Sequence, residues 1–452
     1  MRRLLMAFAG MCLLGGNTYG QEVEPPIYKN DEGEEIFGPE YMPGSPVDVG
    51  LPLFMGRPNA GVRIPDTLLL VPQDAFRTST TQWSLPSETI ERQLPGDIPF
   101  LRDFRNEFNS TAPLLRFNNV TPRDAGDPQA TAKVHYIDVG QGAGAIVELP
   151  CGVAVVDLGG EWESADGGAA FVNYLKGFLA ARPQYNNTVN VVFISHPHAD
   201  HMNGAKDLMG TSIRVSGVAD NGQTSDKGSV KDQVAFREWV QQGRSDRYSA
   251  VEVSRQVTAT GVTNAVIDPF ACADVTAFWG GFNEKVGVEE DYRNPNNHSV
   301  IVRFDFGKAS FLFMGDLEEA AADDMLDQYD QNPGVFDADV LLLAHHGAEN
   351  GISDKLLKTI TPRVAIISMG DRDSAGAKKY HHPRKKALAV LQDDPEVVSD
   401  LRAQETFWSY PSFTKPMEGL EVTRAIYGTG WEGTLIVSAT AAGKYEIESL
   451  GH

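Results

Sequence analysis

Short apolar runs separated by glycine-rich turns begin near residue 133 and recur to the end of the chain. The first three cover residues 134–139, 145–149 and 153–157, and tight turns join them. Apolar runs of this length bounded by Gly and Pro are typical of β-strands. Their short connections predict a meander of three strands.

Helical and strand-like patterns alternate in the rest of the chain. The spacing of apolar positions predicts helices over residues 169–181, 317–327 and 384–392, and strands over 189–194, 299–305, 310–314, 338–344 and 364–368. Strands and helices alternate, with hairpins at both ends of this region. The order predicts an α/β fold in which two sheets pack face to face with helices outside.

The first 130 residues differ from the rest of the chain in amino-acid composition. Residues 1–20 combine Arg2 and Arg3 with an apolar stretch and a small, polar end, which predicts a signal peptide and export to the periplasm or the extracellular space. An uncleaved anchor is the alternative, but it needs about 18 or more apolar residues. Residues 21–130 are rich in Pro, Gly and acidic residues and predict an irregular extension, followed by the folded domain over residues 131–452.

Charge and cysteine content narrow the picture further. The formal net charge of −22 repels polyanions at long range and argues against a broad electrostatic grip on nucleic acid. No second stretch has the length of a membrane span, so we expect none in the mature chain. After residue 20 two cysteines remain, Cys151 and Cys272; an oxidising compartment permits a disulfide between them, and two buried thiols are equally compatible with the sequence.

A dense histidine cluster follows the predicted strand 189–194. His196, His198, Asp200 and His201 place three imidazoles and a carboxylate within six positions. Neutral imidazole suits zinc and similar ions, and a carboxylate adds negative charge. A polar loop without a site is the alternative, but this spacing predicts a metal centre.

Further candidate ligands lie at the ends of later apolar runs. His298 comes just before the strand 299–305, Asp316 follows residues 310–314, and His345 and His346 follow residues 338–344. Rigid strands that end in polar groups can deliver them to one rim. Asp316 also fits the N-cap of the next helix, whereas paired histidines after an apolar strand favour a functional role.

Together these residues resemble the metallo-β-lactamase superfamily, and most closely the soluble domain of ComEC-type DNA-uptake proteins. The resemblance covers about residues 133–449. The matching motifs are residues 136–142, 156–159, 196–204, 220–224, 296–299, 313–316, 344–347 and 380–383, with a closing hairpin at 433–437.

The resemblance implies a four-layered αββα sandwich as the hydrolase domain, with two divalent ions, zinc, manganese or iron, at one edge of the sheets. It assigns His196 and His198 to the first ion, Asp200 and His201 to the second, Asp316 as a bridge and His345 as the last ligand. His298 is either a ligand or a bystander. His346 and His382 are expected to support the site or contact substrate, with His381 as the alternative to His382, and Asp200 to orient or deprotonate a water.

Three functions are compatible with these features. The first is an exported phosphodiesterase or nuclease, favoured by the ComEC-type resemblance and by the basic run at residues 378–386, which either holds phosphate or is a solvated face. The second is hydrolysis of a carboxylic ester, thioester or lactam by the same ions. The third is a binding or scaffolding protein that retains the fold without the chemistry.

Overall fold

The structure is a computed structural model of the 452-residue chain. It describes residues 27–29, 35–37 and 130–451, except 165, 225–227, 253–259 and 282–288. The predicted signal peptide and nearly all of the predicted extension therefore lie outside the described residues. The chain divides into two units, Met1–Tyr41 and Met42–His452. In the first, strands β1 (Ile27–Lys29) and β2 (Glu35–Phe37) pair antiparallel.

The second unit contains an eight-stranded sheet in the order β10-β9-β7-β5-β4-β3-β19-β20. Its centre is the predicted meander, which is antiparallel throughout. The strands are β3 (Thr131–Tyr136), β4 (Gly144–Leu149), β5 (Gly152–Leu158), β7 (Val191–Phe193), β9 (Val218–Asp220), β10 (Tyr248–Ala250), β19 (Leu435–Thr440) and β20 (Tyr445–Ser449). Every residue of β4 and β5 is buried, as expected for central strands covered on both faces.

A six-stranded sheet faces it, in the order β11-β12-β13-β14-β15-β18. The strands are β11 (Asp274–Trp279), β12 (Ile301–Phe306), β13 (Ala309–Phe313), β14 (Val340–Leu342), β15 (Val364–Ile367) and β18 (Ile426–Gly428). Strands β11, β12 and β13 pair antiparallel. Strands β13, β14, β15 and β18 run parallel to one another, and the connections between them contain helices. The carboxyl ends of these parallel strands therefore meet at one edge.

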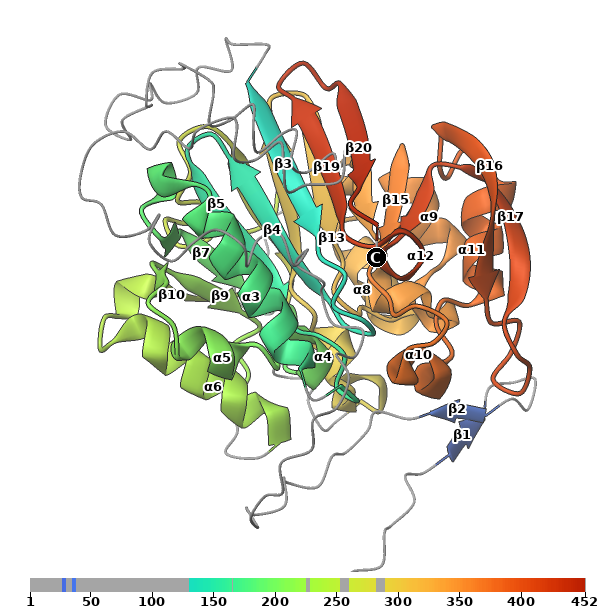
Figure 1. The fold of residues 1–452 in the computed structure, drawn as a ribbon, viewed down its shortest axis with the longest axis horizontal. Coiled ribbons are helices and arrows are strands. Elements are labelled where there is room, and N and C mark those ends of the chain that lie inside the picture. Colours follow the sequence, from blue (N-terminus) through green and yellow to red (C-terminus); the bar gives the residue numbers. More distant parts are fainter. Residues whose placement is uncertain are drawn as a thin grey trace, which may run out of the picture. The chain divides into compact units, whose positions relative to one another are not determined.

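Two cores hold the layers together. Aromatic side chains from both sheets meet between them: Tyr136 stacks on Phe313 at 6.0 Å between ring centroids, and Phe193 meets Phe304 edge-on at 5.8 Å. The other core joins the outer face of the first sheet to the helices that cover it in Figure 1, α3 (Gly167–Ala180), α5 (Ala205–Met209) and α6 (Gly228–Gln241).

Helices also pack against the second sheet. Leu357 and Ile360 of α9 (Asp354–Ile360) and Leu388 of α11 (Lys385–Asp393) belong to the same buried cluster as its strands. The remaining helices of the domain include α4 (Ala199–Met202), α8 (Glu319–Gln328), α10 (Ala375–Tyr380) and α12 (Thr429–Glu432). The predicted α/β architecture of two facing sheets with helices outside is confirmed.

Two local features depart from the sequence-based expectation. The predicted strand 189–194 is interrupted, because the Asn190 side chain accepts a hydrogen bond from the Val153 amide at 2.9 Å; β6 (Thr188–Val189) leaves the sheet to pair with β8 (Arg214–Val215). The antiparallel pair β16 (Leu401–Ser409) and β17 (Glu418–Arg424) was not predicted. Most side chains of β16 are exposed, so its sequence lacks the apolar alternation of a buried strand.

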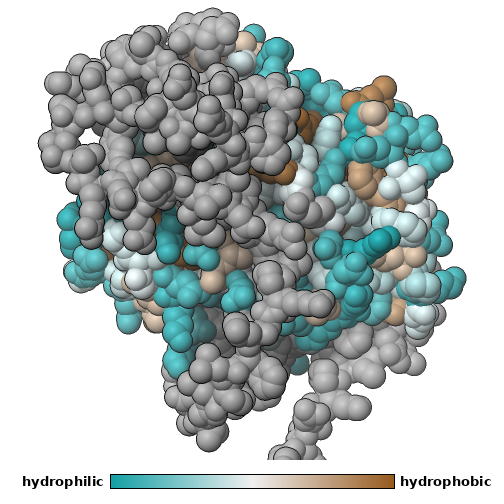
Figure 2. Space-filling view, viewed as in Figure 1, coloured by the Kyte–Doolittle hydropathy of each residue, from teal (hydrophilic) through white to brown (hydrophobic). Residues whose placement is uncertain are grey.

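Covalent and surface features complete the domain. Cys151 and Cys272, which are 121 positions apart, form a disulfide. On the face shown in Figure 2, the described surface is mainly hydrophilic with scattered hydrophobic spots. Within the described residues, we find no helix of the length and apolarity needed to cross a membrane.

Candidate metal centre

Three strand ends bring polar side chains together at one edge of the two sheets. The segment 195–201 follows β7 of the first sheet, whereas Asp316 follows β13 and the segment 344–347 follows β14 in the second. The amide of Val300 donates to the carbonyl of Ser195 at 2.8 Å, which fixes the end of β7 against the start of β12. The side chains at this edge therefore come from rigid elements of both sheets.

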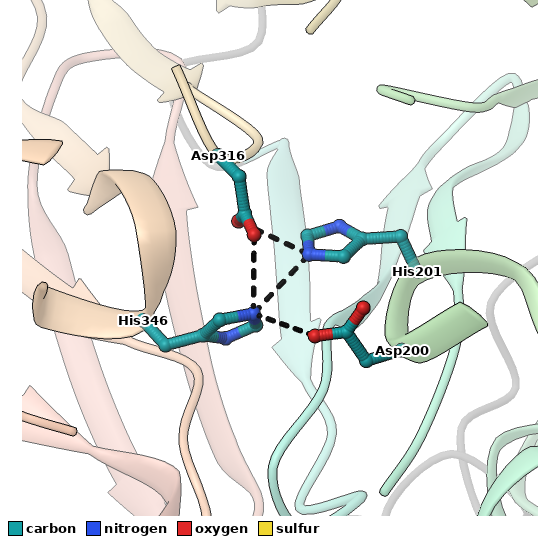
Figure 3. Close-up of side chains that lie close together, drawn as sticks. All are labelled: Asp200, His201, Asp316 and His346. Atoms are coloured by element: carbon teal, nitrogen blue, oxygen red, sulfur yellow. Dashed lines mark hydrogen bonds and ion pairs between the residues drawn. The ribbon is translucent and has the colours of Figure 1, made fainter. Parts of the chain in front are cut away.

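Four of these side chains form a compact cluster (Figure 3). One ligand atom from each of Asp200, His201, Asp316 and His346 lies within 4.8 Å of the others. His201 Nε2 is 3.0 Å from Asp316 Oδ1, and His346 Nε2 is 3.3 Å from Asp200 Oδ2 and 3.5 Å from Asp316 Oδ2. Two imidazoles and two carboxylates are a donor set that suits a divalent transition-metal ion.

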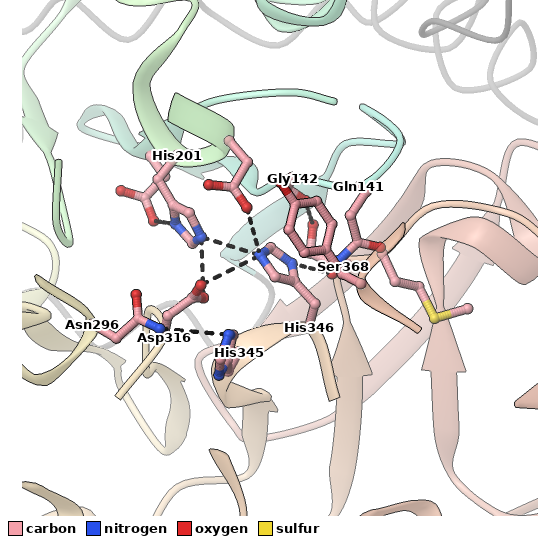
Figure 4. A network of polar contacts seen from close by, with 12 residues as sticks. Gln141, Gly142, His201, Asn296, Asp316, His345, His346 and Ser368 are labelled. Carbon is pink, nitrogen blue, oxygen red and sulfur yellow. Dashed lines mark hydrogen bonds and ion pairs between the residues drawn. The ribbon is translucent and has the colours of Figure 1, made fainter. Parts of the chain in front are cut away.

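Neighbouring groups fix the orientation of both imidazoles in the cluster. Nδ1 of His201 lies 2.8 Å from Oδ2 of Asp157. Nδ1 of His346 lies 2.8 Å from the carbonyl of Ser368, whose hydroxyl donates to the carbonyl of Gly142 (Figure 4). With Nδ1 of each ring engaged in this way, Nε2 is left to face the cluster, which is the usual arrangement of metal-binding histidines.

The buried charges of the cluster raise the pKa values of its two imidazoles and lower that of Asp316. Burial lowers the pKa of His201, but Asp316 and Asp157 outweigh it and raise that pKa well above its usual range. Burial also lowers the pKa of His346, but Asp316 and Asp200 outweigh it and raise that pKa to about 10. Burial raises the pKa of Asp316, yet the two imidazoles hold it well below its usual range. A metal ion would replace the two protons that hold this cluster together, so metal binding should release protons.

His196 and His198 lie beside the cluster. His196 is fully buried, and its ring centroid is 4.7 Å from that of His198 and 4.3 Å from that of His201. Its Nε2 is 3.9 Å from Asp316 Oδ2, and within the described part of the chain it has no hydrogen-bond partner. Burial is the largest cause that lowers the pKa of both rings, which keeps them neutral. A buried, neutral imidazole nitrogen without a partner fits a metal ion.

The structure places His346, not His345, in the four-residue cluster. Both residues have left-handed backbone angles, with φ of 50° and 52°. The turn directs His345 elsewhere: its Nδ1 is 3.0 Å from Asn350 Oδ1 and 3.7 Å from Glu318 Oε1. The arrangement favours the exchange of the two expected roles, with His346 as the candidate ligand and His345 beside the centre.

His298 is not part of the cluster. It is buried with its Nε2 3.0 Å from the carbonyl of Tyr292, and its ring lies edge-on to the Tyr292 ring at 5.5 Å. Of the two alternatives left open for His298, this position favours the bystander. Asn296, two residues earlier in the same 3₁₀ helix η7 (Pro295–His298), faces His345 instead.

The structure also separates His381 from His382. The His382 ring lies 5.3 Å from that of His345, and its buried Nδ1 has no hydrogen-bond partner among the described residues. Burial, together with His345 and His346, lowers the pKa of His382 well below its usual range. The His381 ring instead contacts Tyr410 and Phe413 at 4.8 and 5.6 Å. His382 is therefore the one beside the candidate centre.

The basic run at residues 378–386 is largely neutralised by acidic side chains. Each of its four lysines lies against a carboxylate; the pairs are Lys378–Asp373, Lys379–Glu163, Lys385–Glu418 and Lys386–Glu349. The guanidinium of Arg384 is buried over the ring of Phe413, 4.2 Å from its centroid. This run offers little free positive charge for a phosphate.

Sequence reasoning missed the role of Asp157. It lies in the motif 156–159, and it accepts from the amide and hydroxyl of Ser195 as well as contacting His201. Its φ of 55° is uncommon for a residue with a side chain. A carboxylate near the end of a buried strand, one residue before the pair Gly159-Gly160, is the signal in the sequence that could have pointed to it.

Comparisons with known proteins agree with this geometry. The sequence model of the metallo-beta-lactamase superfamily matches residues 137–371, more than half of the chain. The chain is 31% identical to ComE operon protein 3 of Bacillus subtilis (strain 168) over 102 residues, which are 23% of this chain and 12% of that protein. It is 24% identical to the uncharacterized protein YcaI of Escherichia coli (strain K12) over 242 residues, which are 52% of this chain and 25% of that protein.

Both matches leave most of the relatives' length uncovered, since the chain spans a quarter of it or less. Among solved structures, the metallo-beta-lactamase fold protein YhfI from Bacillus subtilis is similar with 9% identity and a TM-score of 0.34; the match covers 70% of this chain and 100% of that one. The family match covers the segments that carry His196, Asp316 and His346. The chain belongs to the metallo-β-lactamase superfamily, whose members are metal-dependent hydrolases.

Proposed function

We propose that this chain is an exported phosphodiesterase or nuclease that works with two divalent ions. The observation that carries the proposal is the set of buried donors at the sheet edge, in which the cluster of Asp200, His201, Asp316 and His346 lies next to the unpartnered Nε2 of His196. One ion would be held by that cluster. The other would be held by His196 and His198, with Asp316 shared between the two.

Ions bound at this site would supply Lewis acidity toward a phosphoryl oxygen and would lower the pKa of a water toward neutral pH. The residues of the chain do the rest. Asp157 and the carbonyl of Ser368 orient His201 and His346. Asp200 is the most exposed carboxylate of the cluster, with 24% of its side chain accessible, against 4% for Asp316. Asp200 is therefore the group that reaches an incoming water and can accept its proton.

Two further imidazoles favour a phosphodiester as the substrate. His345 and His382 lie beside the cluster without belonging to it, and the rings are 5.3 Å apart. A neutral imidazole can donate one N–H bond to a non-bridging phosphate oxygen. The resemblance to ComEC-type DNA-uptake proteins favours the same substrate class. Hydrolysis of a carboxylic ester, thioester or lactam remains an outcome of the test.

The disulfide supports export. Disulfides persist in oxidising compartments and are rare in the cytosol, and Cys151 and Cys272 are bonded. Mass determination of the mature N-terminus after expression in a bacterial host, together with periplasmic fractionation, tests the cleavage expected near residue 20. Retention of the full N-terminus in the cytosolic fraction would contradict it.

The deciding experiment measures metal content and turnover on the same preparation. We expect about two ions per chain by mass spectrometry, hydrolysis of bis-p-nitrophenyl phosphate, and loss of hydrolysis after chelation. Asp200→Ala and His201→Ala should remove activity. Turnover of nitrocefin or a thioester, but not of the phosphodiester, would mean that the substrate is a lactam or a thioester instead. A chain that binds no metal would overturn the proposal.

A further inference from the structure

Asn296 presents an amide oxygen that nothing in the described structure engages. The residue is 4% exposed, and its Oδ1 is buried without a hydrogen-bond partner among the described residues. Leaving a buried polar atom unpaired costs about 1–3 kcal/mol. Such an atom next to a candidate metal centre requires an explanation.

The orientation of this amide is fixed by its other end. Nδ2 of Asn296 donates to Oε1 of Glu318 at 2.9 Å, and the same oxygen accepts from Nδ2 of Asn294 at 2.6 Å. An ionised carboxylate accepts only, so it faces the NH₂ group and not the carbonyl oxygen of the amide. Glu318 therefore turns the oxygen of Asn296 away from itself.

The side-chain amide of Asn296 lies next to residues of the candidate centre. Nδ2 of Asn296 is 3.5 Å from Nε2 of His345. Figure 4 shows Asn296 beside Asp316, with the amide nitrogen directed at His345 and the oxygen turned away from it. Asp316 Oδ2 in turn is 3.9 Å from Nε2 of His196, another buried atom with no hydrogen-bond partner among the described residues.

We propose that Oδ1 of Asn296 is a ligand of the ion held by His196 and His198. The inference rests on the two-ion centre of the proposed function and adds a donor to it. An amide oxygen is an accepted ligand for divalent ions, and oxygen donors favour manganese-like ions more than thiolate or imidazole donors do. Glu318 is a positioning residue, because it holds the amide in the orientation that exposes the oxygen to the ion.

A neutral ligand at this position also affects how strongly the centre attracts an anionic substrate. Asn296 adds no negative charge to a centre that already contains two carboxylates, Asp200 and Asp316. Two dications then keep a surplus of positive charge for an anionic phosphodiester, in a chain whose net charge is −22. A carboxylate in the place of Asn296 would hold the ion and reduce that surplus.

The test uses the full purified chain, stripped with chelator and titrated with MnCl₂ or ZnCl₂ by calorimetry, with metal content measured after dialysis. The parent chain should bind two ions. Asn296→Ala should weaken one of them by at least about 10-fold, the lower end of the losses seen when even an indirect partner of a metal is removed. Asn296→Asp, which keeps an oxygen, should retain both ions and raise the KM for bis-p-nitrophenyl phosphate.

Asn350→Ala is the matched control, because Asn350 contacts His345 from its other side, Oδ1 to Nδ1 at 3.0 Å. It should leave metal content at the parent value. Two ions of unchanged affinity in Asn296→Ala would overturn the assignment of Asn296 and leave the proposed function standing. A parent chain with one ion or none would overturn both the two-ion centre and the assignment.

A crystal soaked in MnCl₂ decides the question where Asn296→Ala does not fold. The anomalous density of the ion near His196 should lie about 2.0–2.6 Å from Oδ1 of Asn296. An ion beyond hydrogen-bonding distance of that oxygen would overturn the proposal.

Discussion

Asp157 and His201 form a buried pair in which Oδ2 of the carboxylate lies 2.8 Å from Nδ1 of the ring. The other oxygen, Oδ1, accepts from the amide of Ser195 at 2.7 Å. Asp157 therefore fixes both the backbone at Ser195, where the histidine segment begins, and the ring of His201, where it ends. The pair places Nε2 of His201 in the cluster, of which Asp157 itself is not a member.

Asp157→Asn tests this relationship. Asparagine preserves the shape of the side chain and tolerates the left-handed backbone at this position, but its NH₂ group would meet Nδ1 of His201 as a donor and favour the wrong tautomer. We expect metal affinity to fall about 10- to 100-fold, measured by calorimetry with ZnCl₂. Asp207→Asn, on the exposed side of α5, serves as the control. Equal affinity in both variants would contradict the assigned role.

The neighbouring histidines 345 and 346 are expected to behave differently. His346→Ala removes a member of the cluster and should reduce the metal content by about one ion per chain. His345→Ala should retain both ions and lower kcat/KM for a phosphodiester, because the lost ring lies beside the cluster. Metal analysis and kinetics on the two variants separate the roles. Loss of an ion in His345→Ala alone would restore the ligand set implied by family resemblance.

Sequence reasoning succeeded where position along a strand decides the outcome. A buried strand that ends in a polar group carries that group to the edge of the sheet, so the segments of His201, Asp316 and His346 could be expected to meet. The meander and the helix now described as α3 were predictable for a related reason, since their apolar patterns match the buried faces.

Sequence patterns are less informative where a single turn decides which side chain faces the cluster. The left-handed backbone angles at His345 and His346 bring the second ring, rather than the first, into the cluster. Histidine as a residue type does not predict such angles. In the 3₁₀ helix η7, Asn296 and His298 point to different sides, because residues two apart in a tight helix do not share a face. The sequence left His298 open between ligand and bystander, and in the structure its Nε2 lies 3.0 Å from the carbonyl of Tyr292.

The disulfide should contribute substantially to stability. Cys151 and Cys272 enclose a loop of 121 positions in sequence separation, and a bond across a loop of that length restricts the unfolded chain. In the entropic account, removing it costs about 2–5 kcal/mol. Denaturation by guanidinium with and without reductant measures the loss. The double variant Cys151→Ser, Cys272→Ser should match the reduced parent and respond no further to reductant; equal stability with and without reductant would contradict the bond.

A buried ionic network beneath α3 should make the domain sensitive to acid. Glu148 accepts from Nε of Arg182 at 2.6 Å and lies 3.4 Å from Nε2 of His135. Burial raises the pKa of Glu148, but Arg182 and His135 outweigh it and lower that pKa from 4.5 to about 2. A carboxyl with a lowered folded-state pKa stabilises the fold above its unfolded value. That stability is lost as the pH falls from about 4.5 to about 2.

At about 1.4 kcal/mol for each unit of pKa difference, this contribution is on the order of 3 kcal/mol. His135 acts in the same direction: burial lowers its pKa from 6.5, so the unfolded chain binds a proton more readily and stability falls as the pH drops through that value. Urea denaturation of the parent between pH 7 and pH 3 should show both losses. Glu148→Gln should be less stable at pH 7, because Arg182 keeps a buried charge without its carboxylate, and its stability should fall less between pH 4.5 and pH 3. An identical acid profile in the two proteins would mean that other carboxylates govern the acid response.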